Sequence, residues 1–117
     1  MNERGKSAED IAVIFLKKKG YKIVERNFRC YFGEIDVIAK DEDCLAFIEV
    51  KYRKSDAFGG AVGAVTSMKQ EKIKKTAQLF LQKSGEEPIV RFDVVLITGE
   101  PDNLKKAKIE VIKDAFR

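Results

Sequence analysis

The stretch 33–51 alternates apolar and other residues as a pair of strands does, yet it carries charges where a half-buried strand normally has apolar side chains. Side chains two residues apart share one face of a strand, so Glu34 points with Asp36, and Glu49 points with Lys51. Burying these charges costs stability. The cost is explained if the carboxylates coordinate a divalent cation and the lysine holds an anionic oxygen beside it, as phosphodiester hydrolysis requires.

The hydrophobic patterns predict two helices and five strands. The first three strands are joined by short turns and should form an antiparallel meander, whereas the fourth follows a helix and should lie parallel to the third. The fifth is expected at the edge. We therefore assign the chain to the α/β class, as a single domain over residues 1–117 with a central mixed sheet of about five strands flanked by helices. Helices are expected over 8–19 and 66–82, and strands over 21–29, 34–40, 44–52, 89–98 and 108–113.

The first helix is expected to begin after Ser7, a favoured N-cap residue, and to stop at Gly20. Glu9 opens the stripe that faces the core, so a third acid is directed inward. An alternative holds at this position, because an acid in the first turn also favours the positive end of the helix dipole. The other members of the stripe are Ala12, Val13 and Leu16.

The chain contains no histidine. This excludes Ser-His and Cys-His nucleophiles and histidine-liganded zinc, and it leaves a metal-activated water, a lysine base or a carboxylate pair as routes to hydrolysis. Cys30 and Cys44 lack the spacing of metal ligands. No apolar stretch approaches the roughly 20 residues that span a bilayer, and residues 1–10 are unlike a secretory signal. We expect a cytoplasmic protein without membrane association.

Lysines gather in several short segments, and the formal net charge is +4. Clustered lysines favour a polyanionic partner such as nucleic acid, but lysines on exposed positions serve solubility equally well. Three aromatic residues are candidates for stacking on bases, with packing in the core as the alternative. They are Tyr31, Tyr52 and Phe58.

The helix acid, the strand aspartate and the following Glu-Val-Lys strand resemble the PD-(D/E)XK nuclease superfamily, particularly the archaeal Holliday junction resolvases. More closely, the chain resembles the YraN-like family of uncharacterised bacterial proteins, over nearly its whole length. Ile35 stands where the superfamily often has proline, a substitution that leaves the carboxylate position available. The matching residues are 5–9, 20–21, 26–27, 33–36, 47–51, Arg53, Lys69 and 91–93.

This resemblance implies a restriction-endonuclease-like fold and a metal-dependent endonuclease that acts on DNA, with branched or junction structures as expected substrates. It implies that Asp36 and Glu49 bind Mg²⁺ or Mn²⁺, that the Val50 carbonyl and Glu9 add ligands, and that Lys51 positions or deprotonates the attacking water. A homodimer is implied by analogy, because symmetric cleavage of two strands needs two sites. The expected nucleic-acid contacts are Arg53, Lys54, Lys69 and Gln70.

Three alternatives stay open at this stage. Lys51 and Glu49 are also spaced to form a simple ion pair. The chain could be a nucleic-acid-binding module that has the fold without turnover, or an interaction protein whose acids form only internal salt bridges. Asp93, in an apolar strand, is expected to be a buried hydrogen-bonding anchor near Arg91, with a fourth site acid as the alternative.

Overall fold

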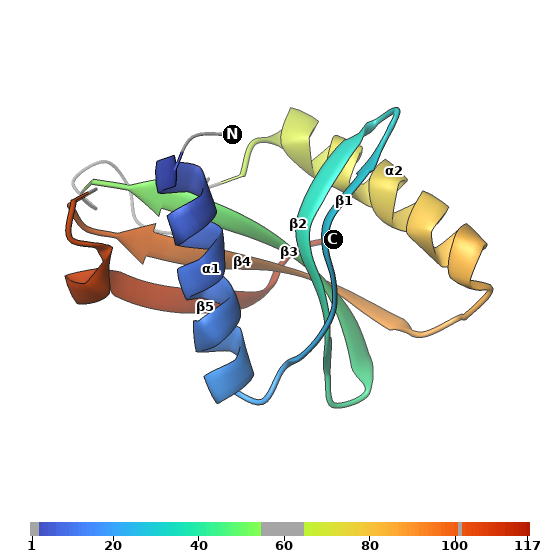
Figure 1. Cartoon of the computed structure of the whole chain (residues 1–117). Coiled ribbons are helices and arrows are strands. Elements are labelled where there is room, and N and C mark those ends of the chain that lie inside the picture. The colour runs from blue at the N-terminus through green and yellow to red at the C-terminus, as the bar shows by residue number, and fades with distance from the viewer. Residues whose placement is uncertain (1–2, 55–64, 101) are drawn as a thin grey trace.

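A five-stranded mixed sheet organises the molecule, with one helix against each face (Figure 1). The computed structural model describes residues 3–54, 65–100 and 102–117, with side chains from Ala8 onward in the first helix. The elements in chain order are α1 (Glu3–Lys18), β1 (Lys22–Cys30), β2 (Gly33–Asp41), β3 (Cys44–Arg53), α2 (Ser67–Ser84), β4 (Ile89–Thr98), the short helix η1 (Leu104–Lys106) and β5 (Lys108–Phe116).

The strands cross the sheet in chain order, from β1 to β5. β1, β2 and β3 pair antiparallel, β4 lies parallel to β3, and β5 pairs antiparallel with β4 at the edge. A parallel neighbour requires a crossover, and α2 provides it. The predicted α/β fold, with its meander, helical crossover and mixed sheet, is confirmed.

Two hydrophobic clusters hold the helices to opposite faces of the sheet. Ile48 of β3 belongs to the cluster that contains the buried stripe of α1, while its neighbour Phe47 belongs to the cluster that contains Ile73 and Ala77 of α2. Adjacent residues of a strand point to opposite faces, so the two clusters lie on either side of the sheet. The predicted stripe of α1 is buried throughout, with Glu9 at its start.

Two element ends differ from expectation by three residues or more, and the others by at most two. α1 begins at Glu3, so Ser7 lies within the helix and is not its N-cap; Glu3 and Arg4 are good helix formers, and no proline stops the helix from extending this far. β5 continues to Phe116, beyond the predicted end at residue 113, because Phe116 stacks on Phe92 with ring centroids 5.1 Å apart. Residues 55–64, which include the candidate stacking residue Phe58, lie outside the described residues.

Both ends of α2 are capped. The hydroxyl of Thr66 accepts a hydrogen bond from the Lys69 backbone N–H at 3.2 Å, which satisfies one of the free donors of the first turn. At the other end Gly85 adopts a left-handed conformation (φ 71°) and its N–H bonds to the carbonyl of Leu81. α2 is thus fixed at both ends, which matters because it carries Lys69.

Asp93 is the anchor of a buried charge network, as expected. Its fully buried carboxylate accepts two bonds from the Arg91 guanidinium, each 2.8 Å, one from the Tyr21 hydroxyl at 2.9 Å and one from the Asp114 N–H at 3.0 Å. Arg91 also bonds to Asp41 at 2.7 Å. This network ties β4 to β2, to β5 and to the residue that precedes β1.

Among the residues that the structure describes, neither helix is long and apolar enough to cross a membrane.

Candidate functional site

The alternation of β2 breaks at Asp36. Ile35 packs in the α2-side cluster and Val37 in the α1-side cluster, although residues two apart normally share a face. The ladder between β2 and β3 also ends here, because its last pair is Val37 with Ile48. Asp36 therefore lies where β2 leaves β3, and side chains from both faces of the sheet can reach it.

At this point the backbone of β3 no longer pairs with the backbone of β2, and the side chain of Asp36 accepts a hydrogen bond from β3 instead. Its Oδ2 accepts a hydrogen bond from the Val50 N–H at 2.8 Å. Its carboxyl group also shares a hydrogen bond with that of Glu49, from the adjoining strand. Both groups are well buried, with Asp36 8% exposed and the Glu49 side chain 11% exposed. The structure thus brings two of the predicted metal ligands into direct contact.

The two carboxyl groups share a proton. Burial raises the pKa of Glu49 from 4.5 to about 8, with the charge of Asp36 as the next cause, while the attraction of Lys69 acts in the other direction. Burial also raises the pKa of Asp36, against the opposing effect of its hydrogen bonds from Val50 and Glu49. Below about pH 8, Glu49 therefore holds the proton and donates it in a hydrogen bond to Asp36.

Glu9 reaches the same region from α1 but does not join the pair. Its side chain bonds to Asn27, and its Oε2 lies 3.9 Å from Nη2 of Arg26. Burial raises its pKa, and the charge of Asp36 adds to this effect. Within the described ranges, no three Cys, Asp or Glu side chains gather closely enough to hold one metal ion. Of the three acids expected to bind one metal ion, Asp36 and Glu49 are in contact, and Glu9 lies near them without joining the pair.

Two lysines lie on the α2 side of the pair. Nζ of Lys69 is 3.9 Å from Oε1 of Glu49, and its side chain is 44% exposed. Lys51 follows Glu49 by two residues on the same face of β3, is exposed, and attracts Glu49 less than Lys69 does. The ammonium group nearest to Glu49 is therefore that of Lys69 on the helix, and the alternative in which Lys51 and Glu49 form a simple ion pair is not seen in the described structure.

The other predicted nucleic-acid contacts occupy different settings. Nε2 of Gln70 donates to the carbonyl of Val65 at 2.9 Å, so this side chain fixes the entry to α2. Nε of Arg53 donates to Oγ1 of Thr98 at 3.3 Å, at the end of the β3–β4 pairing. Lys54 is exposed just beyond β3. Their contact with nucleic acid stays a prediction.

Sequence reasoning did not assign a role to Asn27. It occupies a left-handed conformation (φ 54°) in β1, bonds to Glu9, and has a buried Oδ1 that is the one such side-chain atom without a partner among the described residues. Asparagine tolerates this conformation better than most residues, which is the signal that could have marked it. Its side chain fixes the position of the Glu9 carboxyl group through this hydrogen bond.

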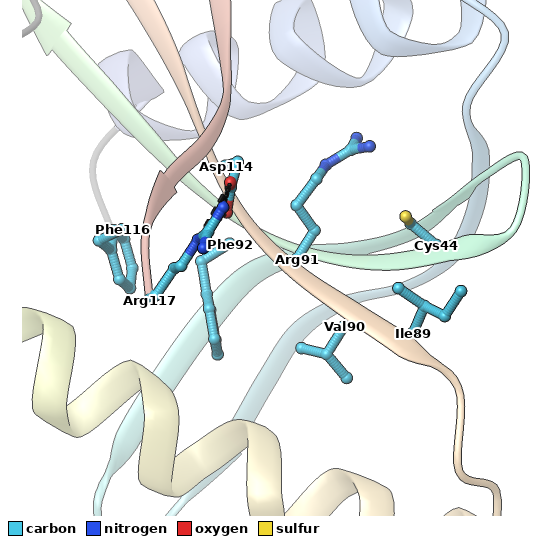
Figure 2. Close-up of a pocket in the computed structure, with 8 residues that line it drawn as sticks. All are labelled: Cys44, Ile89, Val90, Arg91, Phe92, Asp114, Phe116 and Arg117. Carbon is cyan, nitrogen blue, oxygen red and sulfur yellow. Dashed lines mark hydrogen bonds and ion pairs between the residues drawn. The ribbon is translucent and has the colours of Figure 1, made fainter.

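A hollow of about 470 Å³ lies at the end of the sheet where β3 and β4 begin (Figure 2). Its floor is mostly apolar, and Asp114 and Arg117 at its rim are paired with each other at 2.7 Å. In Figure 2 Arg91 extends away from Phe92, and its guanidinium bonds to Asp41 and Asp93. The hollow contains none of the predicted site residues. It is lined by Cys44, Ile89, Val90, Arg91, Phe92, Asp114, Phe116 and Arg117.

Comparison with known proteins places this chain among bacterial sequences of similar length. The profile of the uncharacterised protein family UPF0102 matches residues 8–97. A UPF0102 protein of Geotalea daltonii is 50% identical, over 96% of this chain and 87% of the relative. One from Thermodesulfovibrio yellowstonii is 46% identical, over 97% and 96%, and one from Nitrosomonas europaea is 42% identical, over 97% and 92%.

Proposed function

The chain belongs to the uncharacterised protein family UPF0102, and from the chemistry of its site we propose that it is a metal-dependent endonuclease that acts on DNA, with branched or junction structures as substrates. The observation that carries this proposal is the buried pair of Asp36 and Glu49, which meet beside two lysines at the point where β2 leaves β3. A fold tolerates two buried acids in contact at a cost in stability. This cost in stability is explained if the two acids bind a cation.

The donor set fits Mg²⁺ or Mn²⁺. Both ions prefer oxygen ligands, and Mg²⁺ is commonly held by one or two carboxylates while waters and substrate phosphates fill its other positions. Asp36 and Glu49 supply such a pair, and the predicted carbonyl ligand of Val50 would add a third oxygen. Glu9 lies close enough to Asp36 for the two carboxyl groups to interact through their charges. A third directly bound carboxylate is not needed.

When bound, such a cation lowers the pKa of a coordinated water and offsets the negative charge of the phosphate. Glu49 gives up its proton when it becomes a ligand, and Asp36 keeps its orientation through the bond from the Val50 N–H. Lys69 Nζ, which pairs with Glu49 in this structure, is then available for a phosphate oxygen. Lys51 Nζ, on the same face of β3, donates to the attacking water or to the phosphate.

A cleavage assay tests this function. The chain is incubated with Mg²⁺ or Mn²⁺ and with a four-way junction, a flap, single-stranded DNA and duplex DNA. Cleavage that needs the metal and falls by about a hundredfold or more in Asp36→Asn, Glu49→Gln and Lys51→Ala supports the proposal. The matched controls are Asp43→Asn, Glu86→Gln and Lys17→Ala, all at exposed positions away from the carboxylate pair, and each should leave the rate unchanged.

The separation of Glu9 from the pair favours one other function. Within the described part of the chain the site lacks a three-acid group, which agrees with a nucleic-acid-binding module that does not turn over. This module predicts DNA binding without cleavage, and binding that is unchanged in Glu49→Gln and in Lys51→Ala. That combination of results would overturn the endonuclease proposal.

A further inference from the structure

The tip of the β1–β2 hairpin exposes aromatic and apolar side chains beside the carboxylate pair. Tyr31 is 98% exposed and Phe32 43% exposed, with ring centroids 5.8 Å apart, and Met68 of α2 is 72% exposed. By contrast, Phe28 packs against Phe80 in the α2-side cluster. Large apolar side chains that a small protein leaves in water at one place mark a binding surface.

These side chains border a shallow groove between the hairpin tip and α2, which we name the hairpin-tip groove. Its volume is about 670 Å³. Glu71, one of the lining residues, forms an ion pair with Lys74 at 3.4 Å, so its charge is balanced. The groove therefore takes its positive charge from Lys72 and Lys75. The ammonium group of Lys75 lies 5.7 Å from the ring centroid of Phe32. The lining residues are Tyr31, Phe32, Met68, Glu71, Lys72 and Lys75.

The hairpin is held in place against α2. Pairing of β1 with β2 continues to Cys30 and Gly33, directly at the tip. The thiol of Cys30 donates to Oγ1 of Thr76 at 3.5 Å, and a Cβ placed on Gly33 would lie 3.8 Å from Cβ of Lys72. The aromatic rings are thus presented on a backbone that needs little ordering when a ligand binds, which favours affinity.

A row of lysines joins the groove to the carboxylate pair. Lys69, Lys72 and Lys75 follow one another at three-residue spacing on α2, so neighbours in the row lie on the same side of the helix. The first of them pairs with Glu49 and the other two line the groove. Along β2, the three residue-to-residue steps from Gly33 to Asp36 span about 10 Å, or about three stacked nucleotide steps.

Resting on the proposed function, we propose that the hairpin-tip groove binds an unpaired, single-stranded segment of the DNA substrate. Tyr31 and Phe32 stack on its bases, and Lys72 and Lys75 contact its phosphates. Bases within a duplex are covered by their neighbours and cannot offer a face to these rings. The groove therefore selects DNA with an unpaired stretch next to the bond to be cleaved.

Fluorescence anisotropy without divalent metal tests this inference separately from cleavage. The probes are a labelled oligothymidine and a labelled duplex of equal length, in EDTA. We expect Tyr31→Ala to weaken binding of the oligothymidine about fivefold or more and to change duplex binding less than about twofold. Tyr31→Phe should retain affinity. Ile89→Ala, at an exposed apolar position on the opposite end of the sheet, is the matched control and should have no effect.

Two further measurements report on the mode of binding. The chain has no tryptophan, so Tyr31→Trp introduces a single reporter whose fluorescence should be quenched by the oligothymidine and not by the duplex.

Lys72→Ala with Lys75→Ala should reduce the salt dependence of single-strand binding, by about 0.7 in logarithmic slope for each phosphate that the protein no longer neutralises. Lys17→Ala with Lys18→Ala removes equal charge from α1 and should leave the slope unchanged.

The possible outcomes distinguish a failure of this inference from a failure of the proposed function. If Tyr31→Ala weakens the binding of both probes equally, or weakens the binding of neither, the inference is overturned, even if metal-dependent cleavage is found. Concentration-dependent dimerisation that Tyr31→Ala removes, with single-strand binding unchanged, would assign the groove to a second copy of the chain and would overturn it as well. Selective weakening of single-strand binding in a chain that never cleaves would support the groove and reject the endonuclease.

Discussion

At the scale of single residues, the shared proton of Asp36 and Glu49 dominates the chemistry. Two acids in contact away from water cannot both ionise without a large electrostatic cost, so one retains its proton. Lys69 opposes this effect but does not cancel it, since the pKa of Glu49 is raised to about 8. In the proposed function, a divalent cation would remove the conflict by replacing the proton.

This pair predicts how stability depends on pH without metal. The pKa of Glu49 is about 8 in the folded chain and 4.5 ordinarily, so between these values the folded chain holds a proton that the unfolded chain has released. Stability should therefore fall as pH rises from about 5 to about 8, with a slope of at most about 1.4 kcal/mol per pH unit from this group. Urea unfolding in EDTA at several pH values measures it.

Glu49→Gln is the informative variant for this slope, because glutamine keeps the shape and cannot ionise. Asp36 and the lysines Lys51 and Lys69, which face Glu49, are unchanged in it. The variant should lose most of the decline in stability above about pH 5. Equal slopes in the variant and the natural chain would show that Glu49 is not the group that holds the proton.

A second prediction concerns the buried network of Asp93. Asp93→Asn removes the charge that faces Arg91 inside the protein, and losing one partner of a buried ion pair costs about 3 to 5 kcal/mol. Arg117→Ala removes the exposed pair with Asp114 and should leave the urea midpoint almost unchanged. Similar midpoints for the two variants would contradict a structural role for the network.

At the scale of elements, the order of helices and strands was accessible from the sequence, and part of the site was not. The long apolar run of β4 and the helix before it predict the parallel pairing with β3. The break at Asp36 could not be predicted, because it depends on where the β2–β3 ladder ends. Likewise, the approach of Lys69 to Glu49 depends on how α2 packs on the sheet, which no local pattern specifies.

The cap of α2 gives a prediction at this scale. Thr66→Ala removes the acceptor of the Lys69 N–H and should lower the free energy of unfolding by about 1 kcal/mol. Thr66→Ser restores a hydroxyl at the same place and should recover most of this stability. Equilibrium urea unfolding distinguishes them, and equal stability of the two variants would show that the cap contributes little.

At the scale of the whole molecule, the sheet assembles the site from segments far apart in the chain. α1 brings Glu9, β2 brings Asp36, β3 brings Glu49, and α2 brings Lys69. The sequence predicted the three acids from their positions in strand and helix patterns. It could not show that two of them touch while Glu9 is held by Asn27 and Arg26, because these contacts arise only when α1 and the sheet pack together.

The most direct test of the central claim is the proton that metal binding releases. Calorimetric titration of Mg²⁺ or Mn²⁺ into the chain, repeated in buffers with different ionisation enthalpies, counts these protons. We expect close to one proton per ion near pH 7, falling toward zero near pH 9, and none in Glu49→Gln. Binding without proton release near pH 7, or no binding at millimolar metal, would contradict a carboxylate pair that exchanges its proton for a cation.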